Sequence, residues 1–221
     1  MTLQERFSNL LTEFDISAEY LASYWQTIHE QYSEDGRHYH NLTHLEDVFA
    51  LFDHYADKFN NPTPVMLAIF YHDAIYKTTP LKISSNEKAS AKLAQKHLKA
   101  AGVDDNIIHR VVELIHMTET HDTPADDADA QLFMDLDMSI LAAPQERYLE
   151  YTKQIQQEYK HIPAKMFKSG RLKFIDEALA RPRIFLSDTF FTQHEEQARK
   201  NLQAEKQILQ ASVQKKSDFK P

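Results

Sequence analysis

Apolar residues recur every three or four positions along most of this chain, whereas stretches that alternate strictly between apolar and polar residues are scarce. Because an α-helix turns every 3.6 residues, this spacing predicts amphipathic helices throughout. The expected helices cover about 3–14, 17–32, 41–59, 63–76, 84–102, 104–118, 132–141, 144–159, 163–180 and 187–210. The predicted fold class is therefore all-α, with about nine to ten helices.

No feature of the sequence divides the chain. It contains no internal repeat, no low-complexity segment and no linker rich in proline, glycine or serine. The prediction is a single domain over residues 1–221, with a core at about 38–141 and C-terminal helices at 144–211 that pack on this core. A chain of this length can bury a sizeable core.

The composition excludes several kinds of functional site. Three glycines are too few for the glycine-rich loops that cradle phosphates, and no G-x-S-x-G segment occurs. The chain has no cysteine, which excludes disulfides, thiolate zinc sites and thiol catalysis.

The charge and hydropathy patterns narrow the expected partners and location. A net charge of −8 argues against a general nucleic-acid or anionic-membrane surface, because phosphate groups are held by clustered positive charge. The start of the chain lacks a charged-then-apolar signal, and no apolar run approaches the length that spans a membrane. The expectation is a cytoplasmic protein with no membrane partner, and a homo-oligomer is left open.

The pair His72-Asp73 is the central chemical feature. It lies in an apolar run over residues 68–76, where burial without a polar partner costs several kcal/mol. A divalent cation satisfies both groups, since neutral imidazole and ionised carboxylate together suit metals such as zinc, manganese or iron. Three further helical stretches carry residues of the same kind: His40 with His44, His116 with His121, and Asp135 with Asp137.

The order of these residues resembles the HD superfamily of metal-dependent phosphohydrolases, and the resemblance is carried by His44, His72, Asp73 and Asp137. The segment over residues 39–48, which reads YHNLTHLEDV, is similar to the Y-H-N-x-x-H-A-x-D-V segment of cyclic-nucleotide phosphodiesterases, themselves HD-type catalytic domains. Shorter segments between residues 86 and 202 look similar to a bacterial family described only as predicted HD-type phosphohydrolases.

The resemblance implies an enzyme with a metal centre. By this resemblance, His44, His72, Asp73 and Asp137 bind one or two divalent ions, drawn from Mn, Fe, Zn, Mg, Co and Ni, and Asp73 is free to bridge between two ions. His40 matches the histidine that protonates the leaving oxygen, so that His40 and Asp73 are the predicted catalytic residues. The implied reaction is cleavage of a small phosphoester, with a nucleotide as the favoured substrate, by a metal-activated water.

Two departures weaken the more specific substrate assignments. The phosphodiesterase pattern continues past its His-Asp pair with another histidine, whereas this chain continues with Ala74-Ile75-Tyr76-Lys77. The cyclic-dinucleotide hydrolases of the superfamily place a lysine three residues after the aspartate, where this chain has Tyr76.

Other residues are candidates for supporting roles. His121, Asp135 and Glu87 are candidates for a second ion or for holding the ligands from behind, although Glu87 equally fits a capping box that begins at Ser84. Three arginines are candidates for holding substrate phosphate, because arginine presents a planar fork of donors: Arg171, Arg183 and Arg199. The competing interpretation of these arginines is a set of helix charges paired with nearby glutamates.

Other functions stay open at this point. One is a module that binds a metal and a nucleotide as a sensor without turnover. Another is a cyclic-nucleotide or diphosphate hydrolase, and a third is oxygenation at a di-iron version of the same ligands. The presence of His40 beside all four ligands favours an enzyme, since a pure binder needs no general acid.

Overall fold

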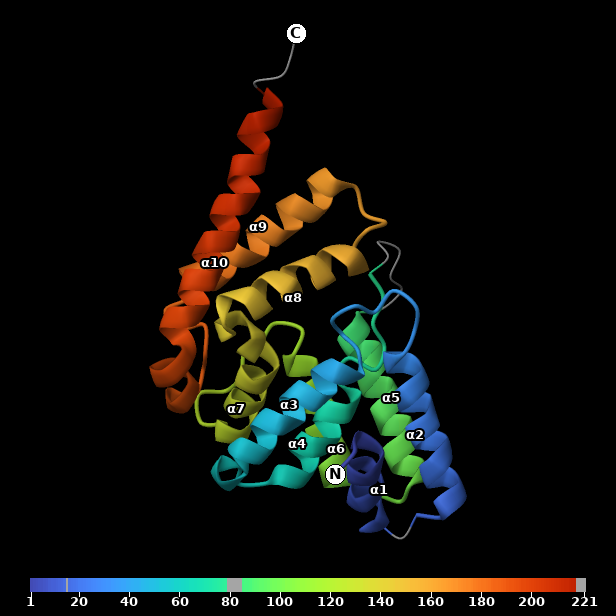
Figure 1. Ribbon diagram of the computed structural model, residues 1–221. Coiled ribbons are helices and arrows are strands. Elements are labelled where there is room, and N and C mark those ends of the chain that lie inside the picture. Colours follow the sequence, from blue (N-terminus) through green and yellow to red (C-terminus); the bar gives the residue numbers. More distant parts are fainter. Residues whose placement is uncertain (15, 79–84, 218–221) are drawn as a thin grey trace. The chain divides into compact units, whose positions relative to one another are not determined.

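The computed structural model describes residues 1–14, 16–78 and 85–217, and within these ranges it consists of helices joined by turns, with no strand (Figure 1). This confirms the all-α prediction. The α-helices are α1 (Leu3–Thr12), α2 (Ala18–Tyr32), α3 (Leu42–His54), α4 (Pro62–Tyr71), α5 (Asn86–Ala100), α6 (Asp105–Met117), α7 (Ala128–Asp137), α8 (Gln145–Glu158), α9 (Ala164–Ala180) and α10 (Asp188–Ser217). Two short 3₁₀ helices, η1 (Ala56–Lys58) and η2 (Met138–Ala142), follow α3 and α7.

Short polar side chains begin several helices, as the sequence suggests. The Asn41 carboxamide oxygen accepts hydrogen bonds from the backbone N–H groups of Thr43 and His44, which caps α3 as predicted. Ser85 caps α5 by accepting from the backbone of Lys88. The predicted capping box ran from Ser84, which lies outside the described residues.

Four predicted helices differ from the structure by more than two residues at one end or both. The helix expected to reach residue 59 ends at His54, and the short 3₁₀ helix η1 follows it. The last helix ends at Ser217 instead of residue 210. The expected helix 132–141 divides into α7, which starts at residue 128, and η2. The helix expected over 63–76 ends at Tyr71, and side chains from other elements bond the main chain that follows it. His72 and Asp73 therefore lie just beyond α4.

The chain divides into two compact units, residues 1–136 and residues 137–221. In the first unit, α4 is apolar on every side and every residue from Leu67 to Tyr71 is buried, as expected for a central helix. Its Phe70 ring packs edge-on against Phe7, with ring centroids 5.0 Å apart, and lies against Phe49 at 4.6 Å. The single-domain prediction is not tested by this division and stays a prediction.

The second unit contains a buried polar network. The Arg171 guanidinium donates to both carboxylate oxygens of Glu205, at 2.8 and 3.0 Å, and to the hydroxyl of Tyr151 at 3.2 Å. The Tyr148 hydroxyl donates to the same Glu205 carboxylate. Arg171 and Glu205 are both less than a tenth exposed. Removal of either residue would leave the charge of the other buried without a partner, which destabilises the fold.

Replacing Arg171 with alanine is expected to lower the free energy of unfolding of the protein by about 3–5 kcal/mol, because the Glu205 charge would stay buried without its partner. Urea unfolding measures the change. Arg183→Ala is the matched control, since Arg183 is 41 % exposed and pairs with an exposed Asp188, and we expect a change below about 1 kcal/mol. Equal losses in the two variants would contradict a structural role for the network.

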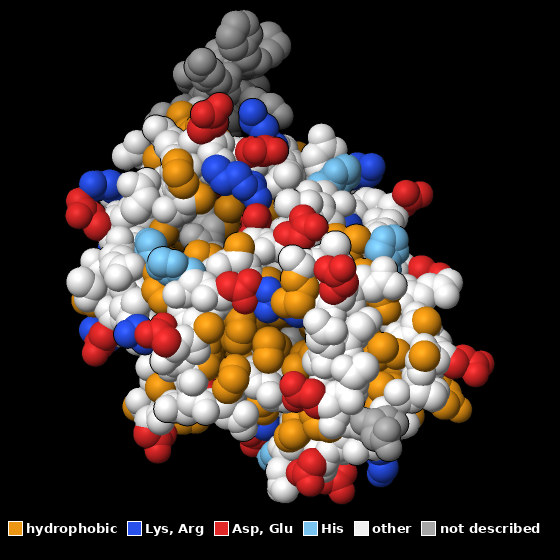
Figure 2. Space-filling view, turned by 60° about the horizontal axis from the view of Figure 1, so that its bottom comes forward, with side chains coloured by type: hydrophobic (Ala, Val, Ile, Leu, Met, Phe, Trp, Pro, Cys, Tyr) orange, Lys and Arg blue, Asp and Glu red, His pale blue; other side chains and the backbone are white. Residues whose placement is uncertain are grey.

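In the described part of the chain, no helix is long and apolar enough to cross a membrane. On the face shown in Figure 2, acidic and basic side chains are interspersed with one another.

Candidate metal centre

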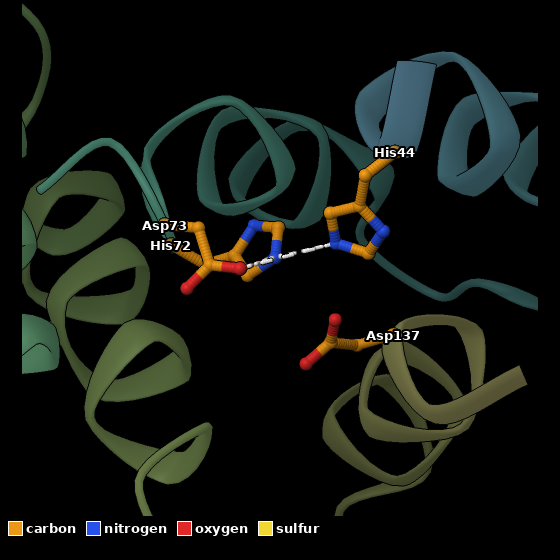
Figure 3. A group of neighbouring side chains, drawn as sticks. All are labelled: His44, His72, Asp73 and Asp137. Atoms are coloured by element: carbon orange, nitrogen blue, oxygen red, sulfur yellow. Dashed lines mark hydrogen bonds and ion pairs between the residues drawn. The ribbon is translucent and has the colours of Figure 1, made fainter. Parts of the chain in front are cut away.

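Four of the predicted ligands meet at one point. The group consists of His44, His72, Asp73 and Asp137, called the His/Asp group below, and each residue offers one ligand atom within 4.8 Å of the other three (Figure 3). The two imidazole Nε2 atoms lie 3.2 Å apart. The Asp73 Oδ2 atom lies 3.3 Å from Nε2 of His72 and 3.9 Å from Nε2 of His44.

Separate helices place these side chains. His44 lies in the first turn of α3, directly after the Asn41 cap, and its ring is buried. His72 caps the end of α4, and Asp73 follows it in the turn. Asp137 is the last residue of α7, and the division into two units falls at that residue. Three helix ends therefore supply the whole group.

A hydrogen bond to the main chain fixes the orientation of the His72 ring. Its Nδ1 atom lies 2.9 Å from the carbonyl oxygen of Ile69. A carbonyl oxygen only accepts, so we assign the proton to Nδ1, which leaves a lone pair on Nε2 that faces His44 and Asp73. The same arrangement, a ring N–H bonded to a backbone carbonyl, orients histidine ligands in known metal sites.

The spacing and charge of the His/Asp group fit a divalent cation. Ligand atoms about 2.0–2.1 Å from an ion lie roughly 3–3.5 Å from one another. The two shortest separations in the group, 3.2 and 3.3 Å, fall in this range. In the forms that bind metals, two ionised carboxylates and two neutral imidazoles would together carry a charge of −2, and both histidines are at most 3 % exposed. A dication would balance this charge where water cannot. The group could therefore bind a metal ion.

The turn that carries Asp73 is held by side chains from other elements. The Asp73 N–H donates to the Tyr32 hydroxyl at 3.2 Å, and the Ile75 N–H donates to the Ser90 hydroxyl at 3.0 Å. The Asn86 carboxamide accepts from the Lys77 N–H at 3.0 Å. These bonds replace the helical bonds that the sequence predicted as far as residue 76, and they fix the position of Asp73.

His40 lies beside the group. Its ring centroid is 6.0 Å from that of His44. The ring stacks on Tyr76, with centroids 4.0 Å apart and planes inclined by 23°. This placement suits a histidine that acts next to the ligands without being one, as the sequence prediction requires, and the Tyr76 ring restricts its rotation.

The remaining sequence candidates for a metal site do not join the His/Asp group. Asp135 is buried on α7 two residues before Asp137, and residues two apart on a helix face different directions. His121 follows α6 with a positive φ of 52°, and Glu87 lies in the first turn of α5. Their predicted role in a second ion or in supporting the ligands stays a prediction.

The three candidate phosphate arginines are engaged elsewhere. Arg171 belongs to the buried network with Glu205. Arg199 donates to Glu195 and to the carbonyls of residues 179, 181 and 182, where it caps the end of α9, and Arg183 pairs with Asp188. These contacts favour the competing interpretation, helix charges paired with acidic residues, over contact with a substrate phosphate.

One histidine that is not a candidate for the site, His97, lies in the core with a hydrogen-bond partner. His97 is 6 % exposed, stacks on Tyr24 with ring centroids 4.3 Å apart, and shares a hydrogen bond of 3.2 Å with the Tyr71 hydroxyl. Burial, and next the charge of Lys96, lowers the pKa of His97 to about 4. Its imidazole is therefore neutral at pH 7, and it serves packing.

Sequence reasoning missed the residues that hold the Asp73 turn: Tyr32, Arg37, Asn86 and Ser90. Ser90 and Asn86 gave one usable signal, since a small polar residue on the buried face of a helix needs a partner. Tyr32 and Arg37 gave none, because a tyrosine at a helix end and an arginine in a polar turn are common.

Comparison with known proteins adds no relative: no protein-family model, no curated protein and no solved structure matches this chain. The assignment of a function therefore depends on the residues of the site and on their geometry.

Proposed function

We propose that this protein is a metal-dependent phosphohydrolase of the HD type that cleaves a small phosphoester, with a nucleotide as the expected substrate and the cytoplasm as the expected location. One observation carries the proposal. His44, His72, Asp73 and Asp137 converge within 4.8 Å, and an additional histidine, His40, lies beside them with its ring stacked on Tyr76. A site that only bound a metal would have no use for that histidine.

The two kinds of side chain in the His/Asp group would contribute differently to metal binding. The imidazoles of the His/Asp group offer neutral nitrogen ligands, and its carboxylates supply the negative charge that holds a dication. When bound there, a divalent cation would lower the pKa of water towards neutrality for attack on phosphorus and would polarise a phosphoryl oxygen. The candidate metals are manganese, iron, zinc, magnesium, cobalt and nickel, as one or two ions.

His40 would complete the reaction from the leaving-group side. As the bond from water oxygen to phosphorus forms and the bond from phosphorus to the leaving oxygen breaks, the protonated His40 ring would give its proton to that oxygen. An alkoxide released without a proton is a poor leaving group, so this transfer removes part of the barrier. Stacking on Tyr76 limits the ring orientations that His40 can adopt.

Turnover on a panel of phosphoesters tests the proposal. The panel contains p-nitrophenyl phosphate, nucleoside monophosphates, cyclic nucleotides and nucleoside diphosphates, each with added Mn²⁺ and each with EDTA. We expect release of phosphate or of a nucleoside monophosphate from at least one class, and loss of that release with EDTA. A protein that is loaded with metal and cleaves no member of the panel would favour the sensor alternative.

A further inference from the structure

A single side chain connects the two segments that carry the proposed acid and a proposed ligand. One terminal nitrogen of the Arg37 guanidinium, Nη1, donates to the carbonyl oxygen of His40 at 3.0 Å and to that of Asp73 at 2.7 Å. The other terminal nitrogen, Nη2, donates to the carbonyl oxygen of Ala74 at 2.8 Å. Arg37 therefore bonds the main chain of both residues directly.

A turn of the backbone at Gly36 places Arg37 near the main chain of His40 and Asp73. Gly36 has a φ of +93°, a conformation that side chains rarely adopt, and it turns the chain after α2. An ion pair of Lys77 with both carboxylate oxygens of Glu34, at 2.9 and 3.1 Å, connects the same turn to the segment after Asp73. The turn and the segment are thus joined at two points.

The contacts of Arg37 are unusual for an arginine. Among the described residues its guanidinium contacts no carboxylate, and it lies over the rings of Tyr32 and Tyr76, at 5.1 and 5.8 Å from their centroids. Within the described part of the chain, its buried Nε atom has no hydrogen-bond partner. Main-chain carbonyl groups and aromatic rings, and not an acidic partner, therefore define the placement of this side chain.

Asp73 is held from both sides. Its N–H group donates to the Tyr32 hydroxyl, and its carbonyl oxygen accepts from Arg37. Movement of either partner would shift the peptide that carries the carboxylate. The carbonyl of His40 depends on the same guanidinium, so the positions of the two residues are linked.

We propose that Arg37 is a positioning residue that sets the distance between the His40 ring and the Asp73 carboxylate. Its catalytic consequence rests on the proposed function, whereas its effect on the metal ligand does not. Residues that orient ligands in metal sites typically contribute about 10- to 100-fold to metal affinity or activity when they are removed.

Cobalt binding tests the first consequence. Arg37→Lys keeps the charge but replaces two terminal nitrogens by one, which cannot reach all three carbonyl oxygens in the same geometry. Titration with Co²⁺ is expected to show an affinity about 10- to 100-fold below that of the wild type and an altered visible absorption spectrum. Arg6→Lys is the matched control, because Arg6 pairs with Asp53 on the same unit, and it should bind Co²⁺ like the wild type.

A double-mutant cycle tests the link to His40. Arg37→Lys is expected to lower kcat about 10-fold or more with little change in KM, and to have a much smaller effect when His40 is already alanine. A purely structural role would lower kcat by the same factor in both backgrounds, and that result would overturn the link.

A second variant, Tyr32→Phe, tests the proposal even if Arg37→Lys does not fold. Tyr32→Phe removes only the hydroxyl that accepts from the Asp73 N–H and is expected to weaken Co²⁺ binding in the same direction. Wild-type affinity in Tyr32→Phe, together with wild-type affinity in a folded Arg37→Lys, would overturn the proposal. If the wild type binds Co²⁺ but hydrolyses nothing, the proposed function fails while the cobalt titrations still decide the role of Arg37.

Discussion

Asp73→Ala is expected to abolish both the binding of a divalent metal and phosphoester hydrolysis. The substitution removes one of two carboxylates from the His/Asp group and leaves the Nε2 atoms of His44 and His72 without the oxygen that lies 3.3–3.9 Å from them. Elemental analysis and the phosphoester panel measure the two losses. A variant that is active and replete with metal would contradict the assignment of the site.

The Asp73 substitution is well suited to this test because it should not disturb the fold. Tyr32 and Arg37 hold the main chain of residue 73, and alanine keeps both of these contacts. The matched control is Asp57→Ala, which removes a carboxylate that is 77 % exposed on the same unit. This control should keep its metal and its activity. With EDTA present, thermal unfolding of both variants should match that of the wild type within a few degrees, because no bound metal then contributes to the stability of the wild type.

His40→Ala is expected to keep the metal but to lower kcat by roughly a hundred- to ten-thousand-fold, the usual contribution of a general acid. The metal should remain because His40 is not a member of the His/Asp group, and kcat should fall because His40 lies next to that group. Steady-state kinetics on the best substrate of the panel, with metal content determined on the same sample, measures the effect.

The matched control for His40 is His109→Ala, because the His109 side chain is 75 % exposed on α6 and pairs with Glu113. This variant should be indistinguishable from the wild type. An unchanged rate in His40→Ala would remove the proposed acid from the mechanism and would return His40 to the role of a residue that packs against Tyr76.

Helical periodicity predicted the fold class and most of the helices, because each helix buries an apolar stripe that the sequence displays directly. It failed at the end of α4, where the apolar run continues to Tyr76 but the helix stops at Tyr71. The main chain beyond that point is bonded by Tyr32, Ser90 and Asn86. Such contacts join residues 9 to 41 positions apart in the chain, and no local pattern reveals them.

For the candidate site as well, the sequence predicted the residue types, whereas the contacts between distant residues appear only in the structure. The order of the histidines and aspartates indicated which side chains belong together, and the structure brings His44, His72, Asp73 and Asp137 to one point. The residue type of Arg171 indicated an affinity for an anion, but only the structure shows that Glu205 is its partner. Sequence patterns therefore predict which groups can bind a charge, and the fold determines which charge they meet.

The central claim is that the His/Asp group binds a divalent metal, and the most direct test is the metal content of the purified, untagged wild type by elemental analysis. The account predicts one or two transition-metal ions per chain, either as purified or after incubation with Mn²⁺ and removal of the excess. A protein that holds no metal after this loading would contradict the account and would leave the convergence of His44, His72, Asp73 and Asp137 without a chemical role.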